Sequence, residues 1–302
     1  MLATVFVREF HSFRFVEGVF FMKQPAHSPR VSPTVRLTET AVMIALGTVL
    51  SLVKLIDLPY GGSVTVAHMV PVLLIAYRYG TRWGLFSGLT YGALQLLLGM
   101  KNLSYATSMW AGLAIVCLDY LAAYLFLAAG AWFKKALPQP AAVSLGAVCA
   151  CVLRYLCHVI SGATVWAGLA VPTAEALGFS VVYNATYMLP ETIVTVVAAF
   201  YLGSVLDFSK EHLSPRRHTD KKAGFGWRVA AGLLAAATVF ADVRLVFSRL
   251  QDADAGTFSA AGFAAVPWGL VGAVTLVGAV TIGILWRISY TVRINKDKNN
   301  SL

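Results

Sequence analysis

Long apolar stretches run through this 302-residue sequence and limit what it can fold into. An α-helix that crosses the hydrocarbon core of a bilayer needs roughly 20 mostly apolar residues. Stretches near or above that length cover residues 37–57, 83–99, 107–133, 142–170, 177–206, 227–249 and 262–288. Another stretch, residues 64–78, is short, and we expect it to form a tilted or partly re-entrant helix packed against protein. The sequence therefore predicts an all-α integral membrane protein with six segments followed by two.

The composition excludes several other classes of protein. Hydrophobic residues make up 58% of the chain, charged residues make up 13%, and the mean hydropathy is +0.71. Soluble domains average about 45–50% apolar and about 25% charged residues. Intrinsic disorder, a secreted disulfide scaffold and a conventional cytosolic enzyme are therefore poor fits.

The net charge of +10 reflects membrane topology rather than a surface for nucleic acid. Basic residues cluster before the first segment, near Arg78, at 134–135, in 210–228 and after the last segment, whereas loops 58–63 and 167–176 contain none. Cytoplasmic loops of membrane proteins carry an excess of Lys and Arg. We therefore expect a multi-pass protein of the cell membrane with both termini cytoplasmic, in contact with anionic lipid and with no nucleic-acid partner.

Charge and apolar patterning divide the chain into parts. We expect a basic cytoplasmic lead-in over residues 1–35, with Met22 as an alternative start of translation. The further parts are a six-helix domain (36–208), a basic cytoplasmic linker (209–226), a two-helix membrane annex (227–290) and a basic cytoplasmic tail (291–302).

The sequence gives little support to catalysis or metal binding. It has no nucleotide-binding loop of the form G-x-x-x-x-G-K-[ST], and no spacing of Ser, His and Asp indicates a nucleophile. Cys149 and Cys151 cannot both face one metal ion, because residues two apart on a helix point about 200° apart. We expect no enzymatic activity, no metal and no cofactor.

Ionisable residues within the apolar stretches mark a candidate site, because a charge at membrane depth is costly. Asp119 lies in the stretch 107–133, the fourth when the short stretch 64–78 is counted. Arg154, His158, Gly162 and Trp166 recur every four residues in the next stretch. That spacing drifts only about 40° per step on an α-helix, so the four side chains can line one wall.

The following stretch begins with polar and aromatic residues that include Phe179, Ser180 and Asn184. A carboxylate, aromatic faces and amide or hydroxyl groups together suit a small cation that carries an aromatic ring. The alternative is that Asp119 and Arg154 neutralise each other as a buried pair and bind nothing. We expect no ligand role for the remaining ionisable residues of the segments, Lys54, Glu191, Asp242 and Arg244.

Several ordered strings of residues resemble one family. They are Pro59–Val64, Pro71–Gly80, Leu118–Tyr120, Leu153–Gly162 and Val182–Met188. Through them the stretch Val35–Phe208 resembles the thiamine-specific S components of energy-coupling factor (ECF) transporters, membrane proteins that capture a vitamin for import. The resemblance implies a six-helix bundle with a thiamine pocket near the extracellular face, closed by the loop between its first two helices.

The resemblance also implies a set of ligand-binding residues. These are Asp119, Tyr120, Arg154, His158, Gly162, Trp166, Ser180 and Asn184. In this interpretation Asp119 pairs with the aminopyrimidine or the thiazolium charge, Arg154 orients Asp119, and Trp166 stacks on a ring. His158, Ser180 and Asn184 form hydrogen bonds with the ligand.

The sequence departs from some members of that family at three positions. It has Asp119 where they have Glu, Phe179 where they have a pocket Tyr, and Gly62 where they have a lid Trp. Tyr60 is therefore the candidate lid aromatic.

The resemblance implies partners as well. Ala41 and Ala45 form a smooth A-x-x-x-A face that is similar to the docking site for a transmembrane coupling subunit, which itself rests on two ATPases. Ordinary packing within the bundle explains that spacing equally well.

Three other functions remain open. The first is an S component for another small heteroaromatic vitamin or a thiamine precursor. The second is an autonomous proton-coupled transporter that uses Glu191 or Asp242. The third is a structural or regulatory membrane protein that has lost ligand binding.

Overall fold

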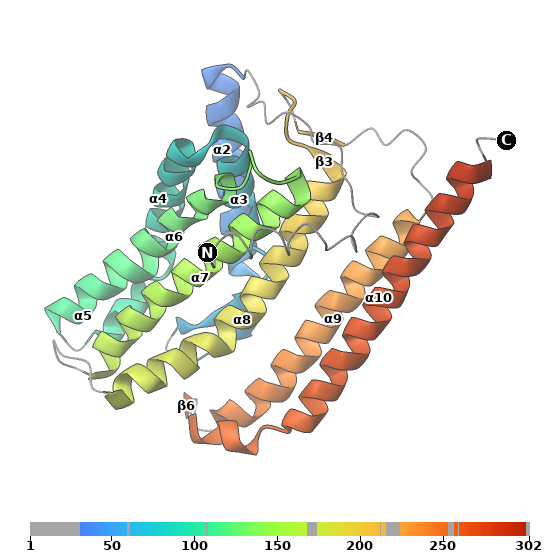
Figure 1. Cartoon of the computed structure of the whole chain (residues 1–302). Helices are drawn as coiled ribbons and strands as arrows, with labels where there is room; N and C mark the ends of the chain where they lie inside the picture. Colours follow the sequence, from blue (N-terminus) through green and yellow to red (C-terminus); the bar gives the residue numbers. More distant parts are fainter. Residues whose placement is uncertain are drawn as a thin grey trace, which may run out of the picture.

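The structure is a computed structural model that describes residues 31–58, 61–106, 108–167, 174–211, 213–215, 224–252, 257–258 and 260–299. The expected lead-in up to residue 30, with Met22, lies outside these residues. The long helices run roughly parallel or antiparallel to one another, so that the start of α2 and the end of α10 lie at the same end of the molecule (Figure 1).

The described chain is predominantly helical. Its principal helices are α2 (Pro33–Leu52), α3 (Val70–Tyr79), α4 (Thr81–Leu98), a continuous run of α5 (Met109–Ala114), η3 (Ile115–Ala122), α6 (Ala123–Leu125) and η4 (Phe126–Ala131), α7 (Gln139–Ala167), α8 (Ala174–Val205), α9 (Phe225–Leu250) and α10 (Trp268–Asn299). Within the described residues, six helical segments are long and apolar enough to cross a membrane, which confirms the prediction of an all-α membrane protein. Two short 3₁₀ segments, η2 (Met100–Tyr105) and η5 (Ala260–Ala265), lie in connecting regions.

The prediction of one apolar helix over residues 37–57 is wrong at its end. The helix α2 ends at Leu52, and β1 (Lys54–Asp57) pairs antiparallel with β2 (Ser63–Thr65). The chain can turn back between β1 and β2 because Gly61 has a φ of +92°, a conformation that residues with a Cβ rarely adopt. Hydropathy alone predicts that the residues of β1 continue the helix α2. Their pairing with β2 instead places them in a hairpin.

The hairpin also takes the first residues of the short stretch 64–78, so that α3 begins only at Val70. Every residue of α3 from Val70 to Arg78 is buried. This burial confirms that the short segment packs against protein on all sides, as a helix too short to span the bilayer requires.

The basic loops expected on one side of the membrane meet at one end of the structure. Arg78 forms a two-point ion pair with Glu39 (2.7 and 2.9 Å) and donates to the carbonyl oxygens of Phe208 and Glu211. Lys134 Nζ donates to the carbonyl oxygen of Arg78, and burial together with the Arg78 charge lowers the pKa of Lys134 to about 8. We call this end of the molecule the basic end.

Two further two-stranded pairs lie outside the bundle. They are β3 (Leu206–Asp207) with β4 (Ser214–Pro215), after α8, and β5 (Gln251–Asp252) with β6 (Thr257–Phe258), between α9 and α10. The expected basic tail from residue 291 is helical as far as Asn299, because α10 continues into it.

The annex consists of α9 and α10, which pack side by side, with α9 against α8 (Figure 1). Near its C-terminal end α9 contributes Val243, Phe247 and Leu250 to an apolar cluster with the hairpin residues Leu58 and Val64. The same cluster includes three residues of α8, Tyr183, Tyr187 and Met188. The annex therefore contacts both the hairpin and the helix behind it.

Candidate functional site

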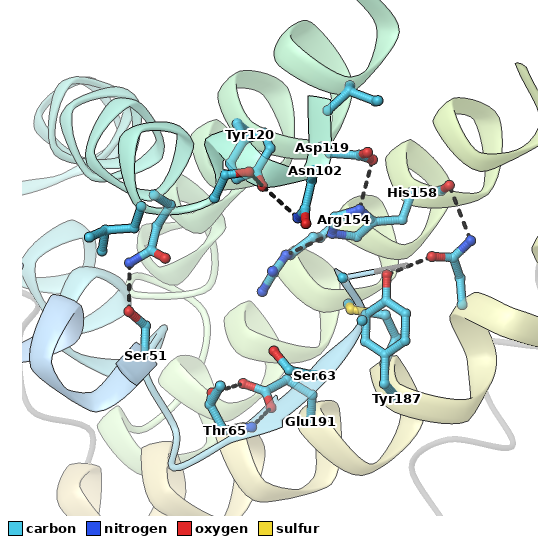
Figure 2. A pocket seen from close by; sticks show the side chains of 18 of the residues that line it. Ser51, Ser63, Thr65, Asn102, Asp119, Tyr120, Arg154, His158, Tyr187 and Glu191 are labelled. Atoms are coloured by element: carbon cyan, nitrogen blue, oxygen red, sulfur yellow. Dashed lines mark hydrogen bonds and ion pairs between the residues drawn. The ribbon is translucent and has the colours of Figure 1, made fainter. Parts of the chain in front are cut away.

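A cavity of about 440 Å³ lies between the hairpin and the bundle (Figure 2). Its polar and charged lining comes from many elements. These residues are Ser51, Lys54, Ser63, Thr65, His68, Gln95, Lys101, Asn102, Tyr105, Asp119, Tyr120, Tyr124, Arg154, His158, Tyr183, Asn184, Tyr187 and Glu191. Six of the sequence-predicted residues line it: Asp119, Tyr120, Arg154, His158, Gly162 and Asn184.

A π-helical segment presents the aspartate and its neighbouring tyrosine together. The segment η3 spans Ile115–Ala122, and both Asp119 and Tyr120 face the cavity. The Tyr120 hydroxyl donates to the Gly99 carbonyl oxygen (3.1 Å) and accepts from Asn102 Nδ2 (2.9 Å). Such wide turns are common at functional sites because they change which side chains share a face.

His158 holds the Asp119 carboxylate. Arg154 Nε donates to His158 Nε2 (3.1 Å), so that ring nitrogen carries no proton. His158 Nδ1 then carries the proton and donates to Asp119 Oδ1 at 2.8 Å. Ser161 Oγ donates to Asp119 Oδ2 (2.9 Å), which fixes the second oxygen. The carboxylate is thus oriented toward the cavity by two residues of α7.

Among the described residues, Arg154 forms no ion pair or hydrogen bond with Asp119, so the alternative of a direct buried pair does not describe the site. Its guanidinium donates to Tyr124 Oη (3.1 Å), lies 4.5 Å above the centre of the Tyr124 ring, and contacts His68 Nε2 (3.2 Å). Arg154 therefore reaches Asp119 only through His158 (Figure 2).

The helix α8 supplies an amide whose position is fixed on three sides. Asn184 Nδ2 donates to the carbonyl oxygens of His158 (3.2 Å) and Ser180 (2.8 Å), and Asn184 Oδ1 accepts from Tyr187 Oη (2.6 Å). This approach of α8 to α7 depends on Gly162, because a Cβ there would collide with Ser180 Oγ.

Two of the predicted ligand-binding residues do not line the cavity and lie behind its lining. Ser180 is fully buried and donates to the Val159 carbonyl oxygen (2.8 Å), and Phe179 stacks on Tyr183 with ring centroids 6.2 Å apart. Neither is among the residues that line the cavity. They position Asn184 and Tyr183 from outside.

Two aromatic predictions fall on residues that are not described. Tyr60 lies outside the described residues, and so does the side chain of Trp166. Some members of the family that the sequence resembles have a lid aromatic at the position of Gly62. Here that position has no room for a side chain. A Cβ at Gly62 would lie 2.7 Å from Tyr187 Cδ1 and 2.8 Å from Tyr183 Oη.

Sequence reasoning missed Glu191, which is buried on the cavity wall (Figure 2). Glu191 Oε2 accepts from the backbone N–H of Thr65 (2.7 Å), and Oε1 accepts from Thr65 Oγ1 (2.9 Å). His68 Nε2 lies 3.3 Å from Glu191 Oε1. The position of Glu191 within an apolar helix was visible in the sequence. Its hydrogen-bond partner Thr65 lies on the hairpin, however, and the spacing of residues along the chain does not predict that contact.

The wall of the cavity therefore joins the half-buried Asp119, the buried Glu191, one guanidinium and several tyrosine rings. Such a cavity, of the size that small-molecule ligands occupy, favours a cation with aromatic character. Among the described residues, no group of three His, Cys, Asp or Glu side chains is placed to hold a metal ion.

Ala41 and Ala45 are both exposed on the outer face of α2. Packing within the bundle, the alternative explanation of their spacing, is therefore wrong for this structure.

Comparison with known proteins places these features in context. Residues 37–208 match the family described as "Thiamine transporter protein (Thia_YuaJ)". The thiamine transporter ThiT of Bacillus subtilis (strain 168) is 31% identical over 179 residues, which cover 54% of this chain and 87% of that protein. A solved structure of ThiT from Listeria monocytogenes is 24% identical, covers 56% of this chain and 93% of that chain, and gives a TM-score of 0.46.

Proposed function

The chain belongs to the Thia_YuaJ family of thiamine transporter proteins, and from that membership we propose that it is the substrate-capture subunit of an ECF-type importer. In this proposal the cavity beneath the hairpin binds thiamine near the extracellular face. A transmembrane coupling subunit and two ATPase subunits then drive its delivery. The cavity belongs to the domain of residues 36–208.

The position of Asp119 carries the proposal. Thiamine joins a permanently charged thiazolium ring to an aminopyrimidine ring. The Asp119 carboxylate faces the cavity with one oxygen bound to His158 and the other to Ser161. Because the counter-charge of Arg154 is directed to Tyr124 and His68, a ligand cation can pair with Asp119 at close range.

The other predicted residues have complementary roles in this proposal. The rings of Tyr120 and Trp166 flank the ligand, and Asn184 hydrogen-bonds to it. His158 acts through Asp119, because both of its ring nitrogens are already bonded. Ser180 and Gly162 set the spacing between α7 and α8, and Phe179 packs against Tyr183 behind the site. Tyr60 remains the candidate lid aromatic in this proposal.

The orientation follows from the positive-inside rule. The basic end contains Arg78, Lys134 and the chain that leaves α8, and we assign it to the cytoplasm. The hairpin lies toward the opposite end of α2 and therefore faces outside. The exposed Ala41 and Ala45 support a docking face for the coupling subunit on α2.

A titration of thiamine into the purified full-length protein tests the ligand, with the separate pyrimidine and thiazole halves titrated beside it. We expect saturable binding of thiamine and weaker binding of each half. Saturable binding of another vitamin, without binding of thiamine, would assign a different ligand to the site.

A reconstitution experiment tests the partners. Uptake into proteoliposomes is expected only when the coupling and ATPase subunits are present with ATP, and Ala41→Trp should reduce their co-purification. Val42→Trp, on a neighbouring exposed position of α2, is the matched control. Uptake by this chain alone, driven by a pH gradient, would instead support an autonomous proton-coupled transporter.

A further inference from the structure

Hydrogen bonds from both ends of β2 hold the β1–β2 hairpin over the cavity. The backbone N–H of Gly62 donates to Tyr183 Oη (3.0 Å) near the turn. At the other end of β2, Thr65 donates twice to Glu191, from its backbone nitrogen (2.7 Å) and from Oγ1 (2.9 Å). Glu191 of α8 and Thr65 of β2 are thus joined by two hydrogen bonds.

This contact is strong for physical reasons. Both oxygens of Glu191 accept a hydrogen bond from Thr65, so the two bonds form and break together. The Glu191 side chain is 2% exposed and Thr65 is 4% exposed, so little water competes for either partner. Breaking the contact would leave a carboxylate and a backbone N–H without partners in a buried place.

The contact is also connected to the ligand-facing carboxylate. Glu191 lies 3.3 Å from His68, His68 lies 3.2 Å from Arg154, Arg154 donates to His158, and His158 donates to Asp119. Figure 2 shows Glu191 with Thr65 at one side of the cavity and Asp119 with His158 at the other. A change of charge at Asp119 can therefore influence the hairpin contact through Arg154.

We propose that Glu191 is a positioning residue that latches the hairpin over the cavity through Thr65, and so sets how fast the ligand enters and leaves. The inference rests on the proposed function for its ligand, which is thiamine. The latch itself concerns the hairpin and is present without a ligand.

Two readouts on the full-length protein test the latch. The first is stopped-flow measurement of thiamine association and dissociation. A latch closes the cavity both before and after binding. Glu191→Met, which removes both acceptors, and Thr65→Val should therefore each raise both rate constants, dissociation by about tenfold, and change the dissociation constant less. Loss of a direct ligand contact would instead raise the dissociation rate and the dissociation constant by the same factor, and that result would overturn the proposal.

The second readout is hydrogen–deuterium exchange of residues 54–65 in the protein without thiamine. Both variants should exchange faster there than the wild type, whereas unchanged exchange would overturn the latch. This measurement needs no ligand, so it separates failure of the latch from failure of the proposed function.

A double variant and a matched control complete the test. The effects of Glu191→Met and Thr65→Val should not add in the double variant, because the two residues act on each other. Thr195→Val makes the same exchange one turn further along α8, where the buried hydroxyl has no hydrogen-bond partner among the described residues, and should leave both readouts unchanged. Additive effects would show that the two residues act separately and would contradict the latch.

Discussion

At the scale of single residues, His158 is the centre of the site. Its two ring nitrogens are both used, one by Arg154 at 3.1 Å and the other by Asp119 at 2.8 Å. A histidine bound in this way fixes the orientation of the carboxylate and separates it from the guanidinium. The site therefore keeps a negative charge available to a ligand although a positive charge lies two side chains away.

Replacing His158 should weaken thiamine binding through Asp119. In His158→Ala both Asp119 Oδ1 and Arg154 Nε lose their partner, and we expect the affinity to fall by at least about tenfold. Titration calorimetry measures the change. Ser144→Ala is the control, because Ser144 lies on the same helix and its hydroxyl bonds only within it, to Pro140; equal losses in both variants would contradict the role of His158.

Spacing was sufficient to predict part of this site. Arg154, His158 and Gly162 share one helix, and regular helical geometry alone places them on one wall. Tyr124, His68 and Glu191 meet them from three other elements, so their positions depend on tertiary packing that no spacing records.

At the scale of secondary structure, the crossing of α7 and α8 determines the shape of the cavity. Gly162 allows Ser180 and Asn184 to lie directly against α7. The hydrophobic pattern predicted both helices, but not the hairpin after α2, because Val53, Leu55 and Ile56 continue the apolar run of that helix. The hairpin exists through its pairing with Ser63–Thr65, which hydropathy does not measure.

Gly162→Ala should separate the two helices at the site. The added methyl group would collide with Ser180 Oγ, and overpacking in a tight contact costs about 1–3 kcal/mol of stability. We expect a lower melting temperature and weaker thiamine binding. Gly178→Ala on α8 meets no atom within 4 Å and should leave stability equal or higher, since alanine favours a helix. A Gly162→Ala protein as stable and as tight-binding as Gly178→Ala would contradict this account of the crossing.

At the scale of the whole molecule, the hairpin lies between the bundle and the annex. Its inner side contacts Glu191 and Tyr183, and its apolar residues Leu58 and Val64 share a cluster with Phe247 of α9. The two C-terminal helices lie outside the matched residues 37–208, yet α9 contacts the element that covers the cavity. Apolar composition predicted both helices, but not the contact of α9 with the hairpin.

Phe247→Ala should therefore affect the cavity although the residue lies in the annex. Removing a buried phenylalanine typically costs about 3 kcal/mol or more, and here the loss falls on the packing of the hairpin. We expect faster thiamine dissociation and lower thermal stability. Phe240→Ala, one of the exposed positions of α9, is the matched control and should change neither. Identical dissociation rates in the two variants would show that the annex does not support the hairpin.

The central claim is that a carboxylate on the cavity wall binds the positive charge of the vitamin. Thiamine titrations of the wild type, Asp119→Asn and Asp242→Asn test it most directly. Asp242 is the matched control because it also lies in an apolar helix, accepts from Thr275 Oγ1 (2.7 Å) and is not part of the cavity. We predict that Asp119→Asn lowers the affinity by at least about tenfold while Asp242→Asn retains it. Wild-type affinity in Asp119→Asn would contradict the account.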